Sequence, residues 1–182
     1  MALKHVMNCA VNKYETLLMQ QLSRRYVDYV AHCIGSNNEE FKALMMIVLH
    51  GKEPLVQRAA WAMDVCLEKH PDLLLPYIDA LIEALARITN NSVKRQVVKA
   101  LASREIPEIY KGQVVDICFC WVQSSDVPVA IKVHCMQILA NITEQYPELA
   151  TELQTVINEQ IPRNSVGFST RWKKILRKNF KL

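Results

Sequence analysis

The chain has 182 residues and a formal net charge of +4 at pH 7. Hydrophobic residues make up 51% of it and charged residues 22%, a composition that is typical of a globular protein. It contains only four glycines, which is too few for a sheet protein with many hairpins, so the composition favours an all-α protein of one domain or a short repeat array.

Residues 1–52 are predicted to form diverged N-terminal helices. Apolar residues recur at helical spacing on both sides of Ser23, where we expect a break. Asn37 or Asn38 is suited to begin the next helix, because its side-chain oxygen can accept a hydrogen bond from a backbone N–H of the first turn. Gly51 is suited to end that helix. Terminal repeats of a repeat protein commonly diverge from the others.

The segment from Pro54 to Ile88 predicts two helices joined by a tight turn. We expect the first helix to begin at Pro54 and to end near Lys69, because Pro71 disfavours helical geometry in the residue before it. In the second helix, Leu73 to Ile88, apolar residues cover nearly the whole circumference. A helix of this kind must be enclosed by neighbouring helices on several sides, which favours a stack.

A short signature occurs three times in the chain: an apolar residue or histidine, then proline, then an acid, then an aliphatic residue. The copies are His70-Pro71-Asp72-Leu73, Ile106-Pro107-Glu108-Ile109 and Tyr146-Pro147-Glu148-Leu149. Their prolines lie 36 and 40 residues apart, a period that is typical of paired-helix repeats.

Over about residues 54–161 this pattern resembles the HEAT/armadillo family of helical repeats. The resemblance implies an all-α, right-handed stack of antiparallel helix pairs, with about four pairs and a C-terminal helix. We expect a single repeat domain over residues 1–182, with three helix pairs in residues 53–161. A plain helical bundle is the alternative.

Two further helix pairs and a loop are predicted after the central pair. Residues 93–102 and 107–122 are expected to form one pair, although VVDICFCWV within the second of them would suit a strand if taken alone. The third pair begins after Ser124 and extends to Ile161. Residues 162–167 contain breaker residues and are predicted to form a loop.

Residues 168–182 are predicted to form a basic amphipathic helix with Ser169 as its N-cap. Its apolar residues share one side: Phe168, Trp172, Ile175, Leu176 and Phe180. Its basic residues occupy the other side, which we call the basic face: Arg171, Lys173, Lys174, Arg177, Lys178 and Lys181. The first 162 residues carry 15 basic and 18 acidic residues, whereas residues 163–182 carry seven basic and no acidic ones.

Three interpretations of this helix remain open. It is a cap that closes the last repeat, with lysines that suit the C-terminal end of the helix dipole. Alternatively, the basic face is a candidate binding surface for nucleic acid or an acidic protein. An interfacial membrane helix is the third interpretation.

The six cysteines favour packing and a reducing compartment rather than disulfides or metal. Cys33, Cys66 and Cys135 lie on apolar helical faces, where free cysteine packs as a small hydrophobe. The cysteines and histidines match no paired metal-ligand spacing, so we expect no metal and no cofactor. The N-terminal residues contain no run of signal-peptide type, and no segment is apolar enough to span a membrane, so a cytoplasmic location is expected.

Catalysis has little support in the sequence but stays open. There is no GxSxG motif and no glycine-rich phosphate loop. A family of DNA glycosylases for alkylated bases is built from such helical repeats, with aromatic, basic and acidic residues on a concave face. Trp61 and Asp64 lie three residues apart on one helix, with Arg58 and Trp121 elsewhere, and resemble such a set without matching a motif of that family.

The sequence therefore predicts a non-catalytic helical-repeat scaffold that mediates protein–protein interaction. The alternative is a nucleic-acid-binding HEAT-like protein that resembles the alkylated-base glycosylases. Another protein is the expected partner, with nucleic acid possible through the C-terminal basic helix, and the oligomeric state is not predicted.

Overall fold

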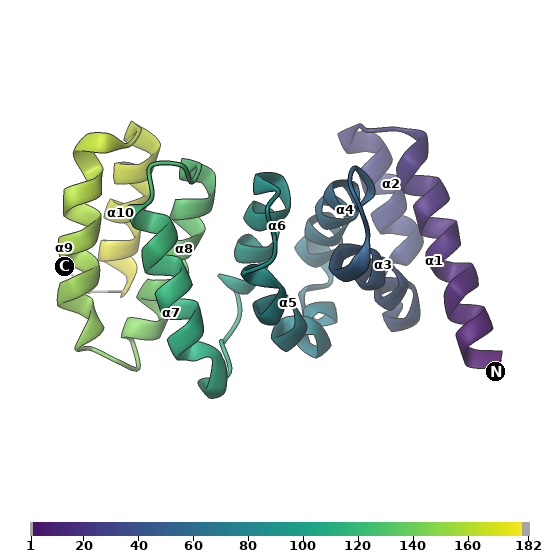
Figure 1. Cartoon of the computed structure of the whole chain (residues 1–182), viewed down its shortest axis with the longest axis horizontal. Helices are drawn as coiled ribbons and strands as arrows, with labels where there is room; N and C mark the ends of the chain where they lie inside the picture. The colour runs from purple at the N-terminus through teal and green to yellow at the C-terminus, as the bar shows by residue number, and fades with distance from the viewer. Residues whose placement is uncertain (1, 180–182) are drawn as a thin grey trace. The chain divides into compact units, whose positions relative to one another are not determined.

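The computed structural model describes the backbone of residues 2–179 and the side chains of residues 10–179. Across this described part the chain is all-α, with ten α-helices, two 3₁₀ helices and no strand (Figure 1). The chain forms two compact units, residues 1–100 and residues 101–182. The prediction of an all-α protein made of stacked helices is confirmed.

The first unit is built around α4 (Leu55–Lys69), which packs against α1, α2 and α3. These three helices are α1 (Ala2–Gln20), α2 (Arg24–Ile34) and α3 (Asn38–His50). Small side chains let α4 approach its neighbours closely, since Ala59, Ala60 and Ala62 are completely buried. The predicted end of this helix at Lys69 is confirmed.

Polar caps fix the ends of these N-terminal helices. The break predicted near Ser23 is present, and the Ser23 hydroxyl accepts a hydrogen bond from the backbone N–H of Tyr26. Asn37 caps α3, because its Oδ1 accepts bonds from the N–H groups of Glu39 at 2.9 Å and Glu40 at 3.3 Å. Gly51 follows the last turn of α3, as predicted.

The single helix predicted from Leu73 to Ile88 is wrong in its first half. Residues Pro71–Tyr77 form the 3₁₀ helix η1, and the α-helix α5 extends only over Ile78–Leu85. Pro76 is the cause, because it lacks the N–H that an α-helix would bond to the carbonyl four residues earlier. Side chains three residues apart eclipse in a 3₁₀ helix, so Leu75 shares the exposed side with Asp72 and is 56% exposed.

The remainder of this segment is enclosed as predicted. Leu74, Leu81, Ile82 and Leu85 are each at most 1% exposed. η1 packs against α3 and α4, and α5 packs against α3. Helix α6 (Asn91–Leu101) follows, and the Asn90 side chain caps it by accepting from the N–H groups of residues 92 and 93.

The second unit is organised around α8 (Val129–Thr143). It packs against α7 (Glu108–Gln123), α9 (Leu149–Gln160) and α10 (Val166–Asn179). The segment VVDICFCWV lies within α7, so the helix predicted from its place in the repeat is confirmed. Each of the three proline-acid signatures lies at the start of a helix, namely η1, α7 and α9.

The boundary predicted between the last pair and the C-terminal helix is shifted. Ile161–Arg163 form a short 3₁₀ helix, η2, and α10 begins at Val166 rather than after Ser169. The backbone oxygen of Ser165 already accepts a bond from the N–H of Phe168, which starts the helix earlier. Ser169 therefore lies inside α10, where its hydroxyl donates to the Val166 carbonyl instead of capping the helix.

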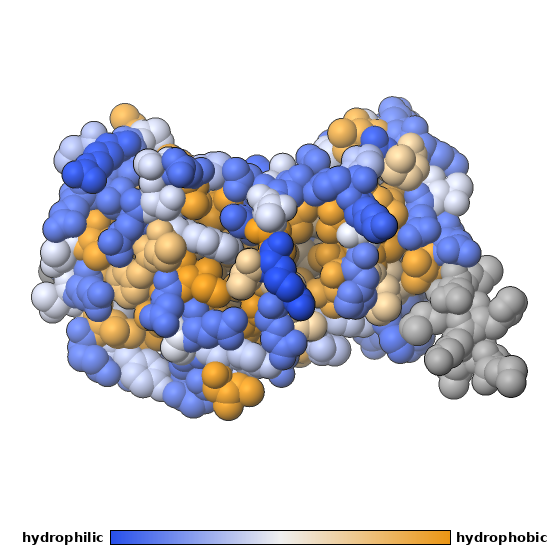
Figure 2. All heavy atoms as spheres, viewed as in Figure 1, coloured by the Kyte–Doolittle hydropathy of each residue, from blue (hydrophilic) through white to orange (hydrophobic). Residues whose placement is uncertain are grey.

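The surface mixes polar and apolar residues. On the face in view in Figure 2, hydrophilic and hydrophobic residues are interspersed. Six large hydrophobic side chains of the described residues are strongly exposed: Met19, Leu22, Tyr29, Leu75, Ile109 and Val166. Scattered residues of this kind are normal on a protein surface.

Candidate binding surface

Helix α10 is held in place by its apolar side. Phe168, Trp172 and Ile175 are 0%, 2% and 1% exposed, and the helix packs against α8 (Figure 1). Burying side chains of this size stabilises a protein by about 1.5–3 kcal/mol each. The apolar side of the predicted helix is therefore confirmed at these three residues. Leu176 is only half-buried, and Phe180 lies outside the described residues.

The opposite side of α10 carries the basic face. Lys173, Lys174, Arg177 and Lys178 are exposed, and none of them has an ion-pair partner among the described residues. Arg171 is half-buried, and Lys181 lies outside the described residues. Arg177 and Lys178 occupy the last turn, where positive charge suits the helix dipole.

Two residues of the basic face also border a cavity of about 530 Å³ in the second unit. Arg171 and Lys178 lie along it on α10, and residues of α8 form another side. The turn between α6 and α7, together with the first turns of α7, contributes Arg104 and Lys111. The structure thus places four basic side chains from two separate segments around one cavity.

Arg171 has hydrogen-bonding capacity to spare. Its Nη2 donates to Oε1 of Gln137 on α8 at 3.0 Å, while its buried Nε has no acceptor among the described residues. A guanidinium has five N–H donors in a fixed planar arrangement that matches carboxylate and phosphate groups. Arg171 is therefore fixed in position by one bond and can donate further ones.

Lys111 is a buried positive charge held by several partners. Its Nζ lies 2.6 Å from Oε2 of Glu108, donates to the Gln145 side chain and sits 5.1 Å from the ring centre of Tyr146. The hydrogen bond between them raises the pKa of Lys111 and lowers the pKa of Glu108. Lys111 consequently stays charged at neutral pH, and its charge is balanced by the Glu108 carboxylate.

Two carboxylates also border the cavity. Glu144 accepts a bond from the Asn179 side chain at 2.7 Å, and Glu105 accepts one from the Gln145 side chain at 3.5 Å. The charged lining is therefore four basic residues against two acidic ones, and one of the four, Lys111, is paired with Glu108.

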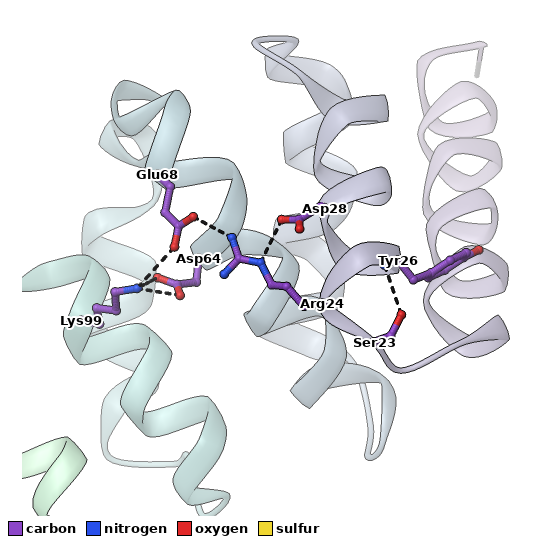
Figure 3. Close-up of polar contacts among 7 residues, drawn as sticks. All are labelled: Ser23, Arg24, Tyr26, Asp28, Asp64, Glu68 and Lys99. Carbon is purple, nitrogen blue, oxygen red and sulfur yellow. Dashed lines mark hydrogen bonds and ion pairs between the residues drawn. The ribbon is translucent and has the colours of Figure 1, made fainter.

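Figure 3 shows a chain of charged residues that crosses α2, α4 and α6 in the first unit. Arg24 lies 2.9 Å from both Asp28 and Glu68. Lys99 lies 2.7 Å from Asp64 and 3.9 Å from Glu68. Positive and negative side chains alternate in this series, so its ion pairs connect the three helices.

Two of the four residues that suggested a glycosylase-like set make contacts between helices. Asp64 belongs to the ion-pair chain, and Nη1 of Arg58 donates to the backbone oxygen of Leu18 on α1 at 2.8 Å. Trp61 is half-buried on α4, whereas Trp121 lies on α7 in the other unit. Arg58 and Asp64 therefore join α4 to neighbouring helices.

Other kinds of site have no support in the described part of the chain. No group of three or more His, Cys, Asp or Glu residues there could hold a metal ion. Within residues 2–179, no helix combines the length and the apolar character that crossing a bilayer requires. Cys66, Cys118 and Cys135 are buried, in keeping with packing, and burial raises the pKa of the Cys66 thiol to about 12.

Sequence reasoning missed Arg104 and Lys111. They lie 67 and 60 residues before Arg171, on either side of a proline-acid signature that indicates only a helix start. No local pattern links them to α10, and only the packing of the second unit brings them to the same cavity.

Comparison with protein-family models matches residues 14–179 to a HEAT repeat domain. Comparisons with curated proteins and with solved structures found no match. The matched segment covers most of the chain and ends at the last residue of α10. The chain therefore belongs to the HEAT repeat domain family.

Proposed function

We propose that this chain acts as a non-catalytic scaffold that binds another protein, and that the basic face of α10 forms part of the binding surface. HEAT repeat domains generally serve as protein-interaction scaffolds. Helical repeats bury contacts with their neighbours and leave long faces exposed to partners, which is the physical basis for this use.

The observation that carries the proposal is the contrast between the two sides of α10. Phe168 and Trp172 are buried where α10 packs against α8, so the helix is held in place. Lys173, Lys174 and Arg177 are exposed and have no ion pair among the described residues. A rigid, unneutralised positive surface favours an acidic partner and speeds its association.

The cytoplasm is the compartment that the cysteines favour. None of the five cysteines whose side chains are described is in a disulfide, and Cys120 is exposed as a free thiol. Exposed free thiols are typical of proteins in a reducing environment.

The test is affinity capture from native cell extract with three versions of the chain. The double substitution Lys173→Glu and Lys174→Glu should lose the captured protein. The matched control Lys52→Glu and Lys69→Glu makes the same change of charge at two exposed lysines of the first unit and should retain it. Equal capture by both variants would rule out the basic face as the binding surface.

A nuclease treatment distinguishes the nucleic-acid alternative. The run of seven basic residues without an acid from Arg163 onward is the feature that favours it. If the captured material disappears after nuclease treatment, and if binding to a DNA duplex weakens steeply with salt, the partner is nucleic acid rather than protein.

A further inference from the structure

Another cavity in the second unit shares no lining residue with the one beside α10. It has a volume of about 370 Å³ and lies where the turn between α7 and α8 meets the end of α9 and η2. The described residues that line it include two basic ones, Lys132 and Arg163, and no acidic one. Asp126, the only acid of residues 124–128, is exposed and does not border it. The lining of this cavity is therefore positively charged.

Lys132 on α8 is a buried cation without a carboxylate partner. It is 3% exposed, and its Nζ makes a long hydrogen bond of 3.4 Å to Oδ1 of Asn164. Nδ2 of Asn164 donates to the backbone oxygen of Gln160, so the amide is oriented with Oδ1 toward the lysine. No carboxylate of the described residues pairs with Lys132, and burial lowers the pKa of its ammonium group. A buried charge is costly unless it is paired, so a bound anion would stabilise this lysine.

Three further groups around the cavity suit an anion. Gln160 is 6% exposed, and its side-chain amide has no hydrogen-bond partner among the described residues. Arg163 of η2 is exposed and has no ion pair within the described part of the chain. The first turn of α8 contains no acidic residue and has no side-chain cap, and Pro128 and Val129 at this end border the cavity. The positive end of the helix dipole therefore adds to the charge of the two cations.

The charge of the lining favours a group that carries more than one negative charge. A carboxylate or a phosphodiester carries a single charge, whereas a phosphate monoester carries about −1.5 to −2 at pH 7 and has three acceptor oxygens. Lys132 and Arg163 together match the charge of the monoester. The Gln160 amide and the Ser165 hydroxyl supply neutral donors. The volume of about 370 Å³ lies near the lower end of the range for ligand sites, which suits a compact group.

We propose that this cavity binds a phosphate monoester, with Lys132 and Arg163 as its cationic partners and Gln160 as a neutral donor. The dipole of α8 stabilises the same group. The site lies outside the basic face of α10, so the proposal goes beyond the protein-binding function proposed above. A small phosphate ester and a phosphorylated serine of a partner protein present the same chemistry, and the experiment distinguishes these two sources.

The experiment titrates the full ¹⁵N-labelled chain with methyl phosphate and follows the backbone amide signals by NMR. Saturable shifts should be concentrated in residues 128–132 and 160–165. Lys132→Met and Arg163→Gln should each weaken binding roughly tenfold, since each removes a charge-assisted contact. Arg87→Gln, the same change at an exposed arginine of the first unit, should alter it less than roughly twofold. Shifts spread over the whole surface, or equal weakening by Arg87→Gln, would overturn the proposal.

Lys132→Met also separates a binding role from a structural one. Replacing a buried charge that has no carboxylate partner by an apolar side chain should leave the melting temperature of the ligand-free chain unchanged or raise it. Methyl phosphate should raise the melting temperature of the unaltered chain but not that of this variant. A lower melting temperature of the variant with unchanged phosphate binding would assign Lys132 to packing and overturn the proposal. If Lys132→Met does not fold, the exposed Arg163→Gln decides the question.

Comparison ligands identify the chemistry and the source of the group. Acetate and dimethyl phosphate, each with a single charge, should bind at least roughly tenfold more weakly than methyl phosphate. Equal or tighter binding of acetate would assign the cavity to carboxylates, and that of dimethyl phosphate would assign it to a nucleic-acid backbone. Either result would overturn the proposal, as would the absence of phosphate binding.

A blocked Gly-phosphoserine-Gly peptide separates the two sources. Tighter binding of this peptide than of methyl phosphate would support a phosphorylated partner protein, and weaker binding would support a small phosphate ester. The capture experiment on the basic face of α10 decides the scaffold function independently of these measurements.

Discussion

Two glycines differ in the space around them. A Cβ on Gly51 would lie 2.4 Å from the backbone oxygen of Ile47, whereas a Cβ on Gly112 would have no atom within 4 Å. Gly51→Ala should therefore lower the free energy of unfolding by about 1–3 kcal/mol, because the end of α3 must shift. Gly112→Ala, in the exposed part of α7, should raise it by about 0.5–1 kcal/mol. Urea unfolding followed by circular dichroism measures the stability of both variants. Equal changes in the same direction would contradict the difference in space around the two glycines.

The Glu40 carboxyl should make the free energy of unfolding depend on pH in the acidic range. A hydrogen bond from the Tyr14 hydroxyl and a second from Lys13 lower the pKa of this carboxyl below its usual 4.5. A pKa that is lowered on folding gives stability that is present above the unfolded-state pKa and is lost as pH falls through the folded-state pKa. The difference in unfolding free energy between the unaltered chain and Glu40→Gln should thus shrink below about pH 4. Tyr14→Phe should reduce the same pH dependence, and a difference that is constant with pH would contradict the account.

The attachment of α10 depends on its buried side rather than on its charges. Trp172→Ala should lower the free energy of unfolding by about 3–5 kcal/mol, since it leaves a large hole against α8. Lys174→Ala, two residues later on the exposed side, should change it by less than about 0.5 kcal/mol. Chemical denaturation of the two variants makes the comparison. Similar stabilities would mean that α10 is not part of the core.

The ion-pair chain of Figure 3 should stabilise the contact between α4 and α6. Asp64 has a side chain that is 12% exposed, so replacing its partner by Lys99→Met leaves a largely buried charge. The expected cost is about 1–3 kcal/mol. Arg24→Met breaks the more exposed pairs with Asp28 and Glu68 and should cost only about 0.2–1 kcal/mol. A double-mutant cycle of Lys99→Met and Asp64→Asn separates the energy of the Asp64–Lys99 ion pair from the cost of leaving Asp64 buried without its partner.

At the scale of the molecule, the two compact units predict local rather than global responses to mutation. In repeat proteins each element contacts mainly its neighbours, so stability is approximately a sum of local terms. Trp172→Ala should accelerate amide hydrogen exchange in residues 101–179 much more than in residues 10–100. Mass spectrometry of the exchanged chain resolves the two regions. Equal acceleration in both would show that they unfold as one cooperative unit.

The sequence by itself determined which segments are helices and most of their boundaries. Ser23, Asn37 and the three proline-acid turns act through hydrogen bonds and backbone geometry within a few residues, so they can be read locally. The amphipathic pattern of residues 168–182 likewise predicted which side of α10 is buried. Pro76 was a local signal that the helix prediction overlooked, and η1 is the result.

Only the tertiary structure decided which distant residues share a surface. Arg104 and Lys111 reach the cavity of Arg171 and Lys178 because α8 holds α7 and α10 on its sides, and no spacing in the sequence encodes that contact. The ion pair between Asp64 and Lys99 likewise forms because their helices pack together, and not because the two residues are close in the sequence. Helix formation depends on interactions across one or two turns, whereas the grouping of charges depends on how whole helices pack.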